Sequence, residues 1–159
     1  MEFHKSTVIR APHQRVWDFL WDIEQMIECI PGCQSATTVE PEKNYQAEVV
    51  QKVGPFRVQF PLDIAIREKQ APHHLVAVAS GRDSRVESSV NVELDLHLKE
   101  KTSQETELSF TANVNLLGKL VTLGHGLIQR KTDEIMTQFA NALKERLEGG
   151  GEGDAVEAV

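Results

Sequence analysis

Between residues 34 and 115, apolar and polar residues alternate with a period of two. Such alternation is typical of antiparallel strands that have one face on a core and the other in water. Turn-forming stretches such as "VGPF" and "SGRDS" separate the alternating segments. The pattern predicts six strands here, including strands at 34–40 and 73–82. The apolar faces of the four clearest strands are Tyr45, Ala47, Val49 and Val53; Phe56, Val58, Phe60, Leu62, Ile64 and Ile66; Val86, Val90, Val92, Leu94, Leu96 and Leu98; and Leu108, Phe110, Ala112 and Val114.

The residues before this region predict one strand and two short helices. Residues 1–10 alternate and end at Ala11-Pro12, which predicts a strand. In "PHQRVWDFLWDIEQMIECIPG", apolar residues recur at helical spacing. Pro12 suits the start of a helix, Pro31-Gly32 ends the helical stretch, and Asp22 divides it into two helices.

After Gly118 the apolar spacing becomes helical again and predicts one helix of about thirty residues. Gly124 and Gly126 lie early in it, and an interior glycine costs about 0.5 to 1 kcal/mol relative to alanine. We therefore expect a feature at these glycines that compensates for this cost. It is one of three: a bend in the helix, a close approach of another backbone segment, or space for a ligand. Residues 149–159 are Gly-rich and acidic, and we predict a disordered tail there.

The order of elements predicts an α+β fold in which a curved antiparallel sheet of about seven strands wraps around the long C-terminal helix. A sheet with one apolar face must cover that face, and only the last helix is large enough to do so. One helix cannot fill a strongly curved sheet. The sequence therefore predicts a cavity between the sheet and the helix.

The composition of the chain excludes several classes of function. The chain has 159 residues, a net charge of -7 and 40% apolar residues, which indicates one globular domain. The acidic balance argues against nucleic-acid binding and offers no basic patch for anionic lipid. Without a signal segment or a run long enough to span a bilayer, and with two cysteines, we expect a cytoplasmic protein.

Four segments in order resemble the family of the G subunit of carbon monoxide dehydrogenase (CoxG), within the START-like (SRPBCC, Bet v 1-like) superfamily of helix-grip folds. They are "APHQRVWDFLWD", "CIPGC", "VGPFRVQF" and "LLGKLVTLGHGLI". The resemblance covers residues 1–148, which we interpret as a START-like ligand-binding domain. It implies a deep apolar pocket under the last helix and a role beside molybdenum hydroxylases of the carbon monoxide dehydrogenase type, which such proteins help to join to the membrane respiratory chain.

The leading hypothesis is a non-catalytic protein that binds a lipid-like or quinone-like molecule, with no other cofactor and no metal. Many relatives carry a longer C-terminal extension suited to membranes, which this chain lacks, so peripheral membrane contact stays open, as does the oligomeric state. The residues expected to line the cavity are Val49, Gln51, Val58, Phe60, Leu62, Ser88, Val90, Val92, Phe110, Ala112, Leu120, Gly124, Leu127 and Ile128. The residues expected at its rim are Ile30, Pro31, Gly32 and Cys33.

Two polar positions in this set have an alternative role. Gln51 and Ser88 have the inward parity of their strands, so each must contact a ligand or be paired within the protein. Contacts with a polar ligand group and hydrogen bonds to nearby backbone are both consistent with the sequence.

Cys29 and Cys33 are best interpreted as packing residues around the Pro31-Gly32 turn. A structural zinc needs about four ligands, and no further local cysteine or histidine supplies them. Their spacing is not that of a thioredoxin-like pair, and no base for a catalytic thiol is evident. A regulatory disulfide stays open.

Two other functions stay open beside the leading one. A protein–protein adaptor would use the helix that carries Trp17 and Trp21, together with the rim near Cys33. An enzyme acting on a small apolar substrate would use His125 or a pocket glutamine as its proton handler. We interpret the remaining polar residues on strands and turns as solvated, among them Arg57, Arg67, His73, His74, Glu87, Glu93, Asp95 and His97.

Overall fold

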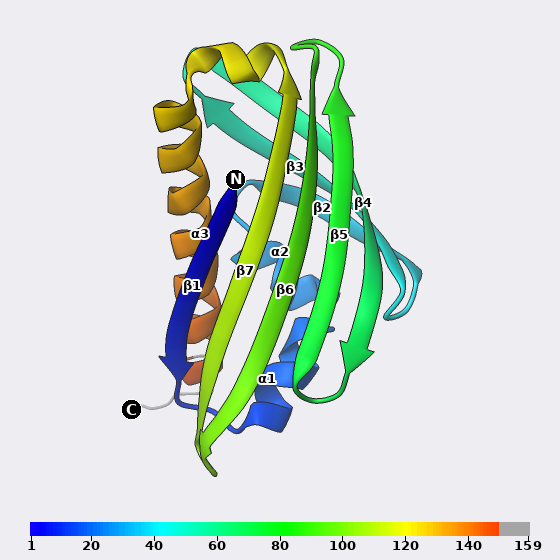
Figure 1. Cartoon of the computed structure of the whole chain (residues 1–159). Helices are drawn as coiled ribbons and strands as arrows, with labels where there is room; N and C mark the ends of the chain where they lie inside the picture. Colours follow the sequence, from blue (N-terminus) through cyan, green and yellow to red (C-terminus); the bar gives the residue numbers. More distant parts are fainter. Residues whose placement is uncertain (150–159) are drawn as a thin grey trace.

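A computed structural model describes residues 1–149, and its elements follow the predicted order (Figure 1). One antiparallel sheet has the strand order β1-β7-β6-β5-β4-β3-β2. Its strands are β1 (Glu2–Ile9), β2 (Cys33–Glu40), β3 (Asn44–Val53), β4 (Phe56–Gln70), β5 (His74–Asp83), β6 (Ser88–Thr102) and β7 (Glu105–Gly118). The helices are α1 (His13–Leu20), α2 (Ile23–Cys29), the 3-10 helix η1 (Lys119–Leu123) and α3 (His125–Glu148). The helix-grip architecture is confirmed.

The predicted division of the first helical stretch at Asp22 is also confirmed. Asp22 is the N-cap of α2, and its carboxylate accepts a hydrogen bond from the backbone N–H of Gln25 at 3.4 Å. An aspartate at this position satisfies a donor that the first turn of a helix leaves unpaired. The strands predicted at 34–40 and 73–82 correspond to β2 and β5.

The prediction of one helix of about thirty residues after Gly118 is wrong in one respect. The segment is split into η1 and a 24-residue α3, with Gly124 between them. Gly124 has φ +100° and ψ 147°, which glycine adopts and other residues avoid. A Cβ atom at Gly124 would have no neighbour within 4 Å. The glycine therefore serves a change of chain direction and not a close backbone approach.

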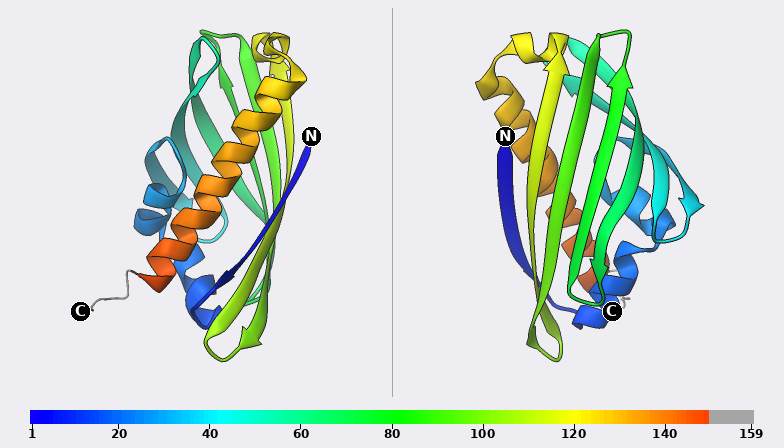
Figure 2. Two further views of the ribbon diagram at one scale, coloured as in Figure 1. Left: turned by 90° about the vertical axis from the view of Figure 1, so that its left-hand side faces the viewer. Right: turned by 45° about the vertical axis from the view of Figure 1, so that its right-hand side comes forward.

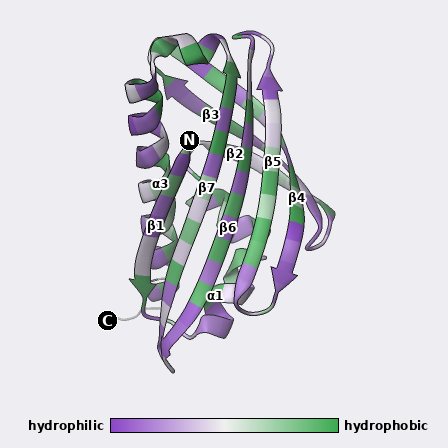
Figure 3. Ribbon diagram, in the orientation of Figure 1, coloured by the Kyte–Doolittle hydropathy of each residue, from purple (hydrophilic) through white to green (hydrophobic). Residues whose placement is uncertain are grey.

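Helix α3 crosses one face of the sheet diagonally and runs beside β1 (Figure 2). We call the face toward α3 the inner face. Along the strands, apolar residues alternate with polar ones (Figure 3). Because successive strand residues point to opposite faces, the apolar side chains gather on the inner face, where the buried clusters lie. Most polar side chains of the same strands lie on the opposite face, which we call the outer face.

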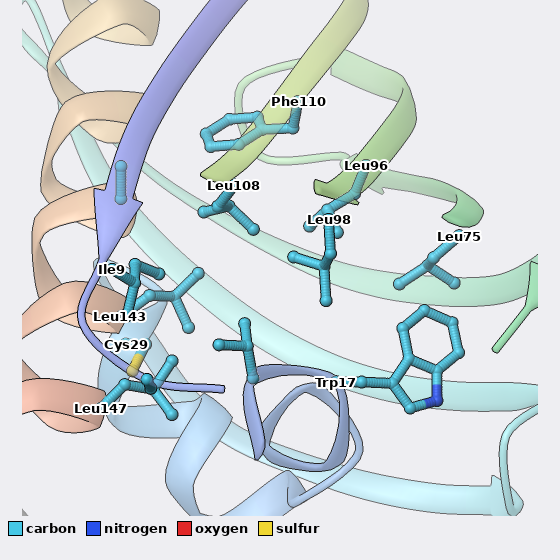
Figure 4. Packing of buried hydrophobic residues seen from close by; sticks show 13 residues of the cluster. Ile9, Trp17, Cys29, Leu75, Leu96, Leu98, Leu108, Phe110, Leu143 and Leu147 are labelled. Atoms are coloured by element: carbon cyan, nitrogen blue, oxygen red, sulfur yellow. The ribbon is translucent and has the colours of Figure 1, made fainter. Parts of the chain in front are cut away.

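The buried apolar residues form three clusters. The lower cluster joins α1, α2 and the C-terminal half of α3 to the sheet, and it includes Trp17, Cys29, Phe110 and Leu143 (Figure 4). The upper cluster joins η1 and the start of α3 to the hairpin of β3 and β4. The bridging cluster consists of Phe3 on β1 and Ala112 and Val114 on β7. Partly buried side chains such as Leu94 and Val90 connect it to the other two.

The predicted tail at 149–159 lies outside the described residues, apart from Gly149 at the end of α3. Within residues 1–149, no helix combines the length and the apolar composition that crossing a bilayer requires.

Candidate functional site

Part of the inner face is apolar but incompletely covered. Val49 on β3, Ile64 on β4 and Ala79 on β5 are partly exposed, and none belongs to a buried cluster or packs against one. The same is true of Ile30 after α2 and Ile135 on α3. We call these five residues the inner strip. These apolar residues therefore keep solvent-accessible surface in the part of the fold formed by β3, β4, β5 and the facing helices.

The strand register shows that the sheet part of the strip faces inward. Ile64 pairs with Ala79, Ala79 pairs with Val92, and Val92 pairs with Val114, whose side chain is buried in the bridging cluster. Directly paired residues of antiparallel strands point to the same face. Ile135 lies seven residues from Ile128, which is buried in the upper cluster, and this spacing places both on one side of α3.

The cavity-lining residues expected from the sequence fall into two groups. Six are partly exposed and thus accessible to a ligand: Val49, Gln51, Leu62, Val90, Val92 and Leu127. Seven are buried: Val58, Phe60, Ser88, Phe110, Ala112, Leu120 and Ile128. Residues with almost no accessible surface, such as Phe110 at 2% and Ala112 at 0%, present nothing to a cavity large enough for water. Gly124 is exposed and has no close neighbour beside its Cα atom.

The side chains of both inward polar residues form hydrogen bonds with backbone groups. The side-chain amide of Gln51 donates to the carbonyl oxygen of Pro31 at 2.8 Å. The hydroxyl of Ser88 donates to the carbonyl oxygen of Val86 and accepts from the backbone N–H of Leu120, each at 3.0 Å. Ser88 is completely buried, so its expected contact with a ligand is replaced by a structural role, which is to hold η1 to the β5–β6 turn.

The loop "CIPGC" is fixed between α2 and β3. Gly32 has φ +79°, and a Cβ atom there would lie 2.0 Å from the carbonyl oxygen of Val50. The carbonyl of Gly32 also accepts from the backbone N–H of Val50 at 2.8 Å. The four predicted rim residues are all partly exposed, and Ile30 belongs to the inner strip.

The two thiols are free in the structure. Cys29 is buried in the lower cluster, and burial raises its pKa to about 11. Burial also raises the pKa of Cys33, whose thiol donates to the carbonyl oxygen of Ser35 at 3.5 Å. Since the thiolate is the nucleophile and the metal ligand, raised pKa values argue against both functions at neutral pH.

The tryptophans of the helix that an adaptor would present, α1, pack within the protein. Trp17 is 4% exposed within the lower cluster, and Trp21 packs edge-on against it with ring centroids 5.6 Å apart. The exposed large apolar side chains in the described part of the chain are Val39, Leu117 and Val121. His125, the proton handler of the enzyme alternative, is exposed at the start of α3.

The outer face carries two adjoining hollows of about 660 and 730 Å³. Both are lined by Gln46, Asp63, Ser80 and Asn91, and so they form one shallow polar trough across the strands. Despite their size, these hollows are not the apolar cavity that the sequence predicts. Most of their lining residues have the outward parity of their strands, and many are amides or charged groups, although Ile64 and Ala79 of the inner strip also border the first hollow.

Comparison with protein families gives a match to the G subunit of carbon monoxide dehydrogenase (CoxG) over residues 6–148. The chain belongs to the CoxG family. A comparison with curated proteins finds no significant match. Among solved structures, a conserved protein from Geobacillus kaustophilus is 18% identical with a TM-score of 0.83, and the match covers 92% of this chain and 95% of that one.

Two further solved structures share the fold at lower similarity. A START superfamily protein from Mycobacterium smegmatis is 10% identical with a TM-score of 0.71, over 92% of this chain and 96% of that one. A protein from Thermus thermophilus is 16% identical with a TM-score of 0.70, over 92% of this chain and 97% of that one. These identities establish the START-like fold alone. Together with membership of the CoxG family, the fold indicates a ligand-binding accessory protein.

Proposed function

We propose that this CoxG protein binds one apolar, lipid-like molecule against the inner strip, between the sheet and helices α2 and α3. The observation that carries the proposal is the partial exposure of Val49, Ile64 and Ala79, which are apolar and belong to no buried cluster. Each Å² of apolar surface that stays in water costs the folded protein about 25 cal/mol of free energy relative to burial. A bound apolar molecule covers that surface and recovers this free energy.

A quinone-like ligand suits this surface. The strip supplies apolar contacts, and the nearby inward polar groups, such as the amide of Gln51, are already bonded to backbone. Such a surface holds a ring and an apolar tail by contact area and offers few directional bonds. Binding without a poised acid, base or nucleophile corresponds to a carrier or donor and not to an enzyme.

The proposed partner is a molybdenum hydroxylase of the carbon monoxide dehydrogenase type, which the CoxG protein serves at the inner face of the membrane. The support for this partner is the family match over residues 6–148. A carrier of this kind passes its apolar ligand between the membrane and the dehydrogenase.

The first experiment is organic extraction of the purified, folded protein, followed by mass spectrometry of the extract. We expect a quinone or another lipid at about one molecule per chain. A protein isolated empty is then titrated with a short-chain quinone, and binding is followed by quenching of tryptophan fluorescence. A protein that releases nothing and takes up no quinone contradicts the proposal and favours the adaptor function.

A pair of variants locates the ligand. Ala79→Phe adds a ring at an inward position of the inner strip, whereas Ala65→Phe adds the same ring at an outward position, one residue from Ile64. Both alanines are partly exposed. We expect Ala79→Phe to lose the ligand and Ala65→Phe to retain it. Equal retention by both variants would place the ligand elsewhere.

A further inference from the structure

Two histidines and one aspartate meet on the outer face near the β4–β5 turn. His74 on β5 pairs directly with His97 on β6, and their rings stack with centroids 4.2 Å apart. Asp95 lies two residues before His97 on the same face of β6. Its Oδ1 atom is 2.7 Å from Nε2 of His74 and 2.9 Å from Nε2 of His97. The two imidazoles thus direct the same ring nitrogen toward one carboxylate oxygen.

We propose that His74, Asp95 and His97 form a binding site for one Zn²⁺ ion. One ligating atom from each residue lies within 4.8 Å of the other two. A tetrahedral zinc ion with bonds of about 2.0 to 2.2 Å needs its ligand atoms about 3.3 Å apart. The Oδ1 atom of Asp95 is 2.7 and 2.9 Å from the two histidine nitrogens, and small side-chain rotations change these distances to the separation that zinc needs. The strand register fixes the Cα positions of His74 and His97, and more than half of the His97 side chain is free of neighbours.

The donor set selects the class of ion. Ca²⁺ and Mg²⁺ prefer sites made of oxygen ligands, which two imidazole nitrogens do not provide. Two imidazoles with one carboxylate suit a borderline divalent ion such as Zn²⁺. Three protein ligands leave the fourth tetrahedral position for water or for a side chain of another molecule. Since the side chains of Asp95 and His97 are 47% and 57% exposed, that position faces solvent.

The zinc site is independent of the proposed ligand. It lies on the outer face, two positions along β6 from Glu93, which lines the polar trough. The inner strip lies on the opposite side of the sheet. The ion joins β5 to β6 on their outer face, and Zn²⁺ binding therefore stabilises the folded protein by mass action.

The test is calorimetric titration of tag-free, chelator-treated protein with ZnCl₂, carried out in the Cys33→Ser background to remove the partly exposed thiol. We expect one Zn²⁺ per chain and no binding of Mg²⁺. His97→Gln and Asp95→Asn each weaken Zn²⁺ binding by more than about tenfold. The matched control is His125→Gln, which changes an exposed histidine at the start of α3 and leaves Zn²⁺ affinity unchanged.

A second readout keeps the test independent of any folding defect in a variant. In the same Cys33→Ser protein, with all histidines intact, the ring ¹⁵N resonances of His74 and His97 shift on addition of Zn²⁺ and those of His125 do not. Absence of stoichiometric Zn²⁺ binding overturns the proposal. Unchanged affinity in well-folded His97→Gln protein, as judged by circular dichroism, also overturns it.

Discussion

The side-chain amide of Gln51 on β3 holds the carbonyl oxygen of Pro31, twenty residues earlier, at 2.8 Å. This bond ties the loop between α2 and β2 to the inner face of the sheet. It also explains the polar residue at an inward strand position, because the partly buried carbonyl of Pro31 needs a donor. The loop that follows α2 is thus fixed in front of β3, beside Ile30 of the inner strip.

Replacement of Gln51 by methionine keeps the length of the side chain and removes the donor. We expect the free energy of unfolding to fall by about 1 to 2 kcal/mol, because the Pro31 carbonyl loses its partner. Urea denaturation measures the change. The control is Gln46→Met, which removes an amide bonded to Asp63 at 3.2 Å on the exposed outer face and costs less than about 0.5 kcal/mol. Equal losses in the two variants would show that the Pro31 bond has no special weight.

Gly32 and Gly126 should respond oppositely to alanine. Gly32 has φ +79° and would place a Cβ atom 2.0 Å from the Val50 carbonyl oxygen, so Gly32→Ala displaces the loop and costs more than about 2 kcal/mol. Gly126 lies in the first turn of α3, where the nearest side-chain atom to an added Cβ is 3.5 Å away on Arg130. Gly126→Ala therefore stabilises the protein by up to about 1 kcal/mol. Thermal denaturation of both variants checks the signs. Stabilisation by Gly32→Ala would contradict the described backbone.

Phe110 and Ile64 distinguish packed core from accessible surface. Phe110 is 2% exposed and meets Phe139 edge-on with centroids 5.6 Å apart, so Phe110→Ala should cost about 3 to 5 kcal/mol. Ile64 is partly exposed and packs against no buried cluster, so Ile64→Ala should cost less than about 2 kcal/mol. Both values come from urea unfolding of ligand-free protein. A loss of full core size at Ile64 would mean that the inner strip is covered.

Asp83 gives a defined response to acid. The side-chain hydrogen bond from Arg85, together with backbone N–H groups of Gln59 and Arg85, lowers the pKa of Asp83 to about 2 from an ordinary value of 3.8. A carboxyl with a lowered pKa in the folded state stabilises the protein fully above pH 3.8. That stabilisation is lost as the pH falls through 2.

We therefore expect Asp83→Asn to be less stable than the unmodified protein at neutral pH and to lose less stability between about pH 4 and pH 2. Melting temperatures measured across this window test the expectation. Asp63→Asn, at an exposed carboxylate of the outer face, serves as the control and should follow the unmodified protein. Parallel curves for Asp83→Asn and the unmodified protein would contradict the role of the Arg85 pair.

The sequence predicts the elements well because alternation and helical spacing are local properties. Asp22 divides the two helices as a local capping residue. The pattern also assigns Phe110 correctly to the inner face, but it cannot distinguish a packed position from an accessible one. That difference depends on the diagonal path of α3, which leaves Ile64 partly exposed and covers Phe110.

Residues that meet through strand register are harder to predict. His74 and His97 are separated by 23 residues in sequence, and nothing local shows that they pair directly. Their interpretation as solvated residues is correct for the exposure of His97 and misses the contact of both rings with Asp95. A prediction would have needed the register of β5 and β6, including the length of the turn between them.

The three clusters make one side of the domain more tightly packed than the other. Along β1, β7 and α3 the apolar packing is continuous, and close-packed interiors of this kind resist deformation. On the side of β3, β4 and β5, the residues of the inner strip stay partly exposed. Helix α2 is joined to α3 by the packing of Cys29 in the lower cluster and by polar contacts of Arg146 with Gln25 and Glu28. The five residues of the inner strip pack against no buried cluster, so separating them from one another breaks little buried packing. We therefore expect a ligand to enter at the inner strip, while the packing along β1, β7 and α3 stays closed.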